Sequence, residues 1–230
     1  GLWYSATTKH ATCAATIKTS LSLDCSKAKS ELGWKPETDE QRASYIIAKE
    51  DWVALVELGE VAVKPLVEAM KWDEGALIIA DYRPEPEKGI KETLKRIGEP
   101  AVEVLIKTLN DKFGKIRQTS AEVLLEIGDE RTLEPFISCI SGQDYETVGH
   151  YAVRGIGKIG GERAIEVLIK MLKNEVKGRP RYYGKMKTIM DTLSLMDEVV
   201  EPLISILDES NRDNPIIEPI AVILGQIGDT

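Results

Sequence analysis

A turn motif, an aliphatic residue followed by glycine and then an acidic residue or a second glycine, returns along most of the chain. It occurs at Leu58-Gly59-Glu60, Ile97-Gly98-Glu99, Ile127-Gly128-Asp129, Ile159-Gly160-Gly161 and Ile227-Gly228-Asp229, while Leu195-Met196-Asp197 occupies the same slot without glycine. Successive motifs from Gly59 onward are 39, 30, 32, 36 and 32 residues apart. A period in this range is typical of stacked helix pairs. The sequence therefore predicts an all-α fold, a right-handed α-solenoid (superhelix).

Each unit is expected to contain an A helix, a tight turn at the glycine and a B helix. The B helices are predicted at residues 61–71, 100–110, 130–141, 161–174 and 198–209, and the A helices are predicted to end at Leu58, Ile97, Ile127, Ile159, Leu195 and Ile227. Glycine suits the turn because the residue that ends the A helix must adopt a left-handed conformation, which a Cβ atom disfavours. Met196 therefore predicts an altered turn.

Apolar residues recur at helical spacing within the B helices, which predicts a core shared between neighbouring pairs. Two examples are Val102, Leu105, Ile106 and Leu109, and Ile165, Leu168, Ile169 and Leu172. The glycines of R-G-I-G-K-I-G-G, residues 154–161, superficially resemble a phosphate-binding loop. The repeat register assigns them instead to a helix end and its turn, so we expect close helix packing there.

Two regions are predicted: an N-terminal arm with a short helix over residues 1–37, and the repeat array over residues 38–230. Thr38 and Gln41 form a capping box that begins the first long helix, which reaches Leu58 with a possible bend at Asp51-Trp52. The array holds about five to six repeats, and the last is incomplete. Its apolar A helix, ending at Ile227, predicts either a longer protein or a partner at this end, such as a second copy of the chain that self-associates through it.

Composition excludes several function classes. The net charge of −8 and pI near 5.1 argue against a general binder of phosphate backbones, which needs excess Lys and Arg. The three cysteines show no paired or metal-ligand spacing, which fits a reducing compartment. No apolar run approaches the roughly 20 residues that span a bilayer, and no signal peptide is apparent. We expect a soluble, cytoplasmic protein without a metal or cofactor.

The aliphatic-Gly-acidic turn, followed by a B helix of the form A-V-E-x-L-I-x-x-L, resembles the HEAT-like repeats named after phycobilisome lyases. The similarity runs from about Thr38 to the C-terminus, and the turns at Gly128 and Gly160 also keep the arginine of the typical G-D-x-R-A pattern, as Arg131 and Arg163. The resemblance implies a HEAT-like, armadillo-type solenoid. It says little about activity, because proteins with this fold range from scaffolds to a few enzymes.

Enzymes of this architecture can be compared with the chain residue by residue. Deoxyhypusine hydroxylases use paired His-Glu motifs to hold a di-iron centre, and this chain has only His10 and His150, the latter followed by Tyr151. His150 therefore indicates a structural histidine rather than a metal ligand. HEAT-like DNA glycosylases use a basic concave surface, whereas this array is acidic. The first activity is excluded, the second is disfavoured, and no catalytic residue is assigned. The chain is expected not to be an enzyme.

In HEAT-type superhelices the B helices line the concave surface, so their exposed positions are the candidate partner-binding residues. These are Lys64, Glu68, Lys71, Glu103, Lys107, Glu134, Ser138, Glu166, Lys170, Lys173, Glu201 and Ser205. The simplest alternative is that Glu103–Lys107 and Glu166–Lys170 are ordinary solvated pairs one helical turn apart.

Two insertions break the period, and insertions on one edge of a solenoid often carry function. They cover residues 72–88 and 175–184 and supply the further candidates Tyr82, Arg83, Arg179, Arg181, Tyr182 and Tyr183. The cations and rings from Arg179 to Lys185 suit an acidic peptide, a phosphate or single-stranded nucleic acid. Alternatively, Tyr182 and Tyr183 simply seat the next helix.

The leading functional prediction is a scaffold that binds a protein or peptide on the concave B-helix surface. A phycobilin-lyase-like protein that handles a tetrapyrrole is the first alternative, with Lys64, Lys107, Lys170 and Arg179 available for its propionates. Nucleic-acid binding through the loop from Arg179 to Lys185 is the second.

Overall fold

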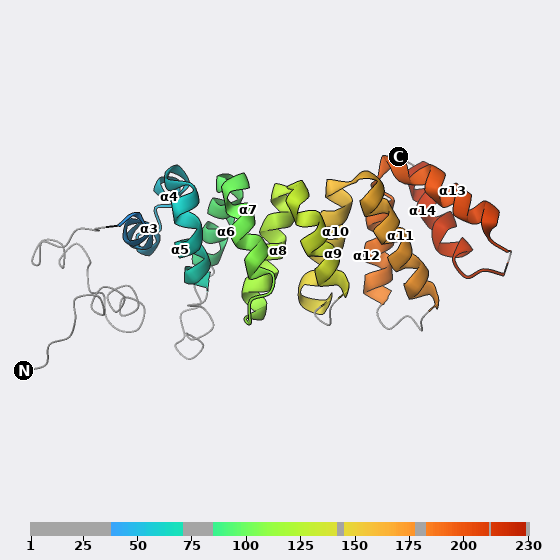
Figure 1. Ribbon diagram of the computed structural model, residues 1–230, viewed down its shortest axis with the longest axis horizontal. Coiled ribbons are helices and arrows are strands. Elements are labelled where there is room, and N and C mark those ends of the chain that lie inside the picture. Colours follow the sequence, from blue (N-terminus) through green and yellow to red (C-terminus); the bar gives the residue numbers. More distant parts are fainter. Residues whose placement is uncertain (1–37, 71–84, 142–144, 178–182, 212, 229–230) are drawn as a thin grey trace, which may run out of the picture. The chain divides into compact units, whose positions relative to one another are not determined.

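The structure is a computed structural model that describes residues 38–70, 85–141, 145–177, 183–211 and 213–228. Every regular element within these ranges is helical, and consecutive helices pack in pairs (Figure 1). The fold is therefore an all-α solenoid, as predicted. The chain divides into two compact units, residues 1–104 and 105–230, which are described in turn. The predicted N-terminal arm, residues 1–37, lies outside the described residues.

The first unit contains α3 (Asp39–Ala48), α4 (Trp52–Leu58), α5 (Glu60–Met70), α6 (Glu85–Ile97) and the 3₁₀ turn η2 (Glu99–Ala101), followed by α7 (Val102–Thr108), which continues past residue 104. Helix α3 packs against α5, and α6 packs against both α4 and α5. The hydroxyl of Thr38 accepts a hydrogen bond from the Gln41 N–H at 3.2 Å, so the predicted start of the first helix is confirmed.

The prediction of one long helix from Thr38 to Leu58 is wrong, because the chain breaks between α3 and α4. Glu50 has a φ of 56°, a left-handed value that ends α3. The carboxylate of Asp51 then caps α4 by accepting a hydrogen bond from the Ala54 N–H at 3.2 Å. The possible bend at Asp51-Trp52 is thus a complete stop and restart of the helix.

The second unit contains α8 (Gly114–Ile127), η3 (Glu130–Thr132), α9 (Leu133–Ser141), the π-helical turn η4 (Tyr145–Gly149), α10 (His150–Ile159), α11 (Gly161–Lys177), α12 (Tyr183–Leu193), η5 (Asp197–Val199), α13 (Val200–Glu209) and α14 (Ile217–Gly228). Helix α10 packs against α8, α9 and α12. Helix α12 also contacts α11 and α14, and α14 contacts α13.

The B helices differ from the predicted ones mainly at their ends. Helices α7, α9 and α13 each follow a 3₁₀ turn that occupies the first residues of the predicted helix. Helix α11 runs on to Lys177 and α12 begins at Tyr183, so the second predicted insertion, 175–184, is shorter than expected. The first, 72–88, ends earlier because residues 85–88 already belong to α6. Residues between these ends lie outside the described ranges.

Positive backbone angles occur at the predicted turn glycines Gly59, Gly98, Gly128 and Gly160, with φ from 57° to 73°. Gly128 alone among these four has the left-handed helical ψ, 33°, whereas ψ is −130°, −129° and −159° at the other three. The prediction of a left-handed helical conformation is therefore wrong at those three glycines, because their ψ angles lie outside that region. Their positive φ angles nevertheless favour glycine. Gly228 stays helical as the last residue of α14.

The altered turn predicted at Met196 is confirmed. Met196 has a φ of −105°, so it does not reproduce the conformation of the turn glycines. Its side chain is buried, whereas the preceding Leu195, which aligns with the aliphatic residue of the other turns, is 85% exposed. The methionine is thus buried at the position of the turn glycine, and the aliphatic position before it, half-buried in the other turns, is exposed here.

The core follows the predicted apolar spacing. Of the eight examples named from the sequence, seven are buried and Ile106 is half-buried. Close helix packing also explains two of the glycines in residues 154–161. A Cβ atom on Gly155 would lie 2.3 Å from the ring of Phe136, and one on Gly157 would lie 2.1 Å from the methyl group of Thr192. These glycines let α10 approach α9 and α12.

Candidate binding groove

The predicted partner-binding residues that the structure describes with their side chains are all exposed, and they stand on the predicted B helices. They are Lys64, Glu68, Glu103, Lys107, Glu134, Ser138, Glu166, Lys170, Lys173, Glu201 and Ser205. Lys71, Tyr82, Arg83, Arg179, Arg181 and Tyr182 lie outside the described residues, and Tyr183 begins α12. Whether these residues bind a partner stays a prediction.

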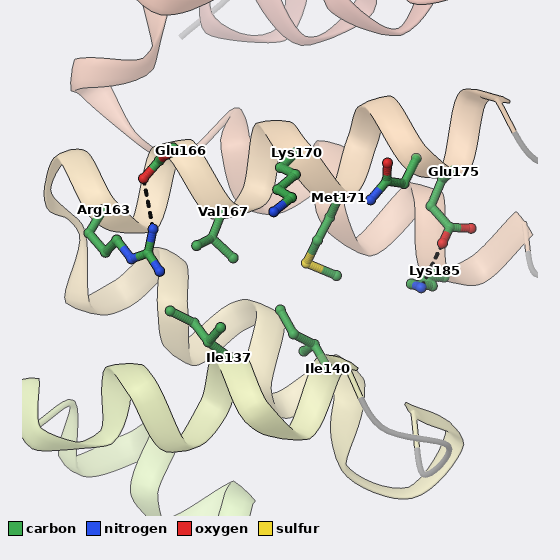
Figure 2. A pocket seen from close by; sticks show the side chains of 10 residues that line it. Ile137, Ile140, Arg163, Glu166, Val167, Lys170, Met171, Glu175 and Lys185 are labelled. Carbon is green, nitrogen blue, oxygen red and sulfur yellow. Dashed lines mark hydrogen bonds and ion pairs between the residues drawn. The ribbon is translucent and has the colours of Figure 1, made fainter.

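A groove of about 250 Å³ lies in the second unit between the B helices α9 and α11, and α12 contributes one residue to it. Figure 2 shows Ile137 and Ile140 rising from α9 toward Val167 and Met171 of α11. The remaining lining residues are polar: Arg163, Glu166, Lys170, Asn174, Glu175 and Lys185. The groove therefore combines an aliphatic lining with charged groups.

Helical periodicity explains which residues of α11 reach the groove. Arg163, Glu166, Lys170 and Asn174 are spaced by three or four residues, so they share one face of the helix. Val167 and Met171 follow Glu166 and Lys170 by one position, at the edge of the buried side, and Val167 is buried while Met171 is half-buried. The groove is thus formed at the border between the core and the exposed stripe.

One end of the groove carries a small ion-pair network. The Arg163 guanidinium donates to the Glu166 carboxylate at 2.9 Å and to Glu134, on α9, at 3.4 Å. Both carboxylates raise the pKa of the Arg163 guanidinium. Glu166 therefore pairs with Arg163, three residues before it, and the alternative of an ordinary Glu166–Lys170 pair is not what the structure shows.

The other end is closed by a second, more sheltered ion pair. Lys185 of α12 contacts Glu175 of α11 at 2.6 Å, and the two side chains are 21% and 17% exposed. The Lys185 ammonium also lies 4.8 Å from the centre of the Tyr145 ring. Because its charge is matched by Glu175, Lys185 offers little net attraction to a nucleic-acid phosphate.

Tyr145, in η4, stands behind this second ion pair. Its hydroxyl is buried and has no hydrogen-bond partner among the described residues. Burial, with a smaller contribution from the negative charge of Glu175, raises the pKa of Tyr145 to about 12. The phenol therefore stays neutral and supports the sheltered ion pair through its ring.

Two hydrogen-bond donors inside the groove have no partner among the residues that the structure describes. Lys170 makes no ion pair, and Asn174 no side-chain hydrogen bond, with any residue in the described ranges. They are one helical turn apart on α11, and Figure 2 shows Lys170 pointing into the space beside Met171. The unmatched positive charge of the groove is thus concentrated at Lys170.

The structure brings together some predicted residues and leaves others apart. Glu166 and Lys170 line the groove, and Glu134 joins it through Arg163. Lys64 lies on α5 in the other unit, where it pairs with Glu40 of α3 at 3.5 Å. The remaining candidates are exposed on α5, α7, α9, α11 and α13 without lining the groove.

Most of the groove could not be found by sequence reasoning. The aliphatic residues Ile137, Ile140, Val167 and Met171 follow the same spacing as the continuous core, and Asn174 stands at the predicted end of its helix. The arginine of the turn motif at Gly160 was one available signal, because Arg163 anchors the groove's first network. The positions bordering the apolar stripe of α11 were a second.

His150, which the sequence predicts to be a structural histidine, is the first residue of α10 and is half-buried. Its ring lies against Tyr151 with the centroids 3.8 Å apart. Burial and then the positive charge of Arg154 lower the pKa of His150, while the negative charge of Glu122 raises it.

In the described part of the chain, no three His, Cys, Asp or Glu side chains cluster in a way that could hold a metal ion. The described helices also include none with the length and apolarity to span a membrane.

Comparison with known proteins shows a family similarity over part of the chain. A search of curated proteins gave no match. Eighteen chains of solved structures match, among them the crystal structure of an engineered protein with 18% sequence identity and a TM-score of 0.42, covering 94% of this chain and 67% of that chain. A family model of HEAT repeats matches residues 84–182. The chain is thus similar to HEAT repeats over the stretch that carries α9 and α11.

Proposed function

We propose that the chain is a non-catalytic binding module that holds a peptide segment of a partner protein in the groove between α9 and α11. The observation that carries the proposal is an aliphatic lining on the B-helix side of a HEAT-like unit, beside hydrogen-bond donors that have no partner in the described part of the chain. Solenoids of this type offer such surfaces to extended partners. Arg163, Glu166, Glu175 and Lys185 are occupied by one another, as expected of groups that shape a site.

The dimensions of the groove favour a peptide over a tetrapyrrole. A volume of about 250 Å³ lies below the roughly 300 to 1,000 Å³ of typical small-molecule pockets, and the apolar lining is aliphatic. From Arg163 to Glu175, α11 extends for about 18 Å at 1.5 Å per residue, a length that about five or six extended residues would match. The two alternatives from the sequence, tetrapyrrole handling and nucleic-acid binding, are therefore less well supported.

Selection of short random peptides displayed on phage tests the proposal even though the partner is unidentified. Peptides enriched on the intact chain would be measured against Met171→Glu, which puts a carboxylate into the groove, and against Ile204→Glu, the same kind of change at an exposed apolar residue of α13. We expect binding to weaken by about tenfold or more with Met171→Glu, equivalent to about 1.4 kcal/mol, and to be unchanged with Ile204→Glu.

Thermal melts of both variants would establish that they are folded. Peptides that bind the intact chain and Met171→Glu equally well would contradict the proposal, because a ligand in the groove cannot ignore a charge placed on its lining. Loss of binding with Ile204→Glu alone would place the contact surface on α13 instead.

A further inference from the structure

We infer that the groove recognises an acidic side chain next to an aliphatic one in the bound segment, with Lys170 and Asn174 as the residues that read the carboxylate. This inference rests on the proposed function and specifies the chemistry of its ligand. It starts from the two donors of α11 that have no partner in the described ranges, beside the aliphatic lining.

The arrangement of the charges in the groove favours an anion beside Lys170. The lining contains the cations Arg163, Lys170 and Lys185 and the carboxylates Glu166 and Glu175, and Glu134 beside Arg163 brings the sum of these charges to zero. Glu134 and Glu166 both pair with Arg163, and Glu175 pairs with Lys185, so Lys170 is the cation of the lining that has no carboxylate partner among the described residues. An incoming carboxylate would satisfy Lys170, whereas an incoming lysine or arginine would meet it as a like charge.

The geometry suits a single carboxylate. Side chains four residues apart on a helix have Cβ atoms about 5 to 6 Å apart and lie on the same face. The ammonium of Lys170 and the amide of Asn174 can therefore donate to the two oxygens of one carboxylate held between them. Hydrogen bonds of this charge-assisted kind are shorter and about twice as strong as neutral ones.

The aliphatic part of the ligand follows from the residues beside these donors. Val167 and Met171 flank Lys170 closely on α11, and Ile137 and Ile140 face them from α9. A segment whose carboxylate reaches Lys170 can thus place an adjacent leucine, isoleucine or valine on this lining. Removing that side chain from water adds affinity in proportion to the apolar area buried.

The test uses the most enriched displayed peptide, made with a fluorescent label, and a second version with each Asp or Glu replaced by Asn or Gln. Both are titrated by fluorescence anisotropy against the intact chain, Lys170→Gln and Lys173→Gln. Lys173 is the matched control, because it is an exposed lysine of the same helix that does not line the groove. Adding sodium chloride gives an independent measure of charge pairing.

We expect the neutral peptide to bind the intact chain about fivefold or more weakly than the acidic one, and Lys170→Gln to weaken the acidic peptide by a similar factor. In Lys170→Gln the two peptides should bind alike, because the pair is already broken. Lys173→Gln should bind like the intact chain, and added salt should weaken the acidic peptide alone.

Two failures can be told apart. If enriched peptides are lost with Met171→Glu but carry no acidic residue, or are unaffected by Lys170→Gln, the inference about the carboxylate is wrong while the proposed function stands. Enrichment of basic peptides would likewise overturn it. If the peptides ignore Met171→Glu, the groove is not the binding surface and both proposals are wrong.

Discussion

Tyr145 illustrates, at the scale of one residue, how burial can set a pH limit on this fold. Its hydroxyl has no hydrogen-bond partner among the described residues, and its pKa is raised from the ordinary value of 10.0 to about 12. The folded state therefore holds the phenol proton more tightly than the unfolded state. The stability linked to this group is fully present below pH 10 and is lost as the pH rises from 10 to about 12.

Tyr145→Phe removes both the orphaned hydroxyl and the titration. We expect the variant to be more stable than the intact chain by about 1 kcal/mol at neutral pH, because an unsatisfied buried polar group is eliminated. Its advantage should widen between pH 10 and 12. Urea denaturation across this pH range measures both effects. Tyr151→Phe is the control, since the Tyr151 hydroxyl accepts a hydrogen bond from Gln118 at 3.3 Å. Parallel stability curves for Tyr145→Phe and the intact chain would refute the assignment.

At the scale of the element, the turn between α12 and α13 differs from the other turns in which residue it buries. The glycine turns place an aliphatic residue, half-buried, before the glycine at Leu58, Ile97, Ile127 and Ile159. At the altered turn the buried side chain is Met196, whose sulfur lies 3.8 Å from where a Cβ atom on Gly157 would be. The methionine thus belongs to the contact between α10 and α12.

Replacing Met196 with the glycine of the other turns should therefore destabilise the fold. We expect Met196→Gly to lower the free energy of unfolding by about 2 to 5 kcal/mol, the range for deleting a buried methionine side chain, because it leaves a cavity beside α10. Leu195→Lys, one position earlier, changes a residue that is 85% exposed and should have little effect. Thermal and chemical denaturation would measure both changes. A more stable Met196→Gly chain would show that the backbone preference of the turn outweighs packing.

At the scale of the whole molecule, the response to a destabilising mutation should reflect the stacking of helical repeats that contact mainly their neighbours. Stability in such arrays is approximately a sum over repeats and their interfaces, so damage stays local. Each of the two compact units contains a glycine at which an added methyl group would overpack the contact with an aromatic ring. A Cβ atom on Gly89 would lie 2.2 Å from the Trp52 ring, and one on Gly155 would lie 2.3 Å from the Phe136 ring.

We expect Gly89→Ala to accelerate amide hydrogen exchange mainly in α4 to α6, and Gly155→Ala mainly in α9 to α12, each through overpacking that costs about 1 to 3 kcal/mol. Gly225→Ala is the control, because a Cβ atom there meets nothing within 4 Å and alanine suits the α14 interior better than glycine. Exchange followed by mass spectrometry resolves the segments. Equal acceleration throughout the chain in either variant would show that the array unfolds as a single cooperative body.

Much of this protein follows from its sequence alone. The spacing of the turn motif predicts the all-α solenoid, and the apolar spacing predicts its core, because helical periodicity and the freedom of glycine at positive φ act within a few residues of the chain. The same periodicity places the exposed stripe of α11, including Glu166 and Lys170. What the sequence pattern did not specify was the break at Glu50, an exposed residue other than glycine at positive φ, where the N–H groups of Glu50 and Asp51 donate to carbonyls in the last turn of α3.

Only the tertiary structure decided which members of the exposed stripe form a site. The groove depends on the separation of α9 from α11, on the reach of Lys185 from α12 to Glu175, and on Arg163 engaging Glu134 across about thirty residues of sequence. A carboxylate on a helix face has several cations within reach, and the choice among them is made by small differences in distance and solvation. Those differences exist once the helices are packed, which is why Lys170 is left unmatched among the described residues and could not be singled out from the sequence.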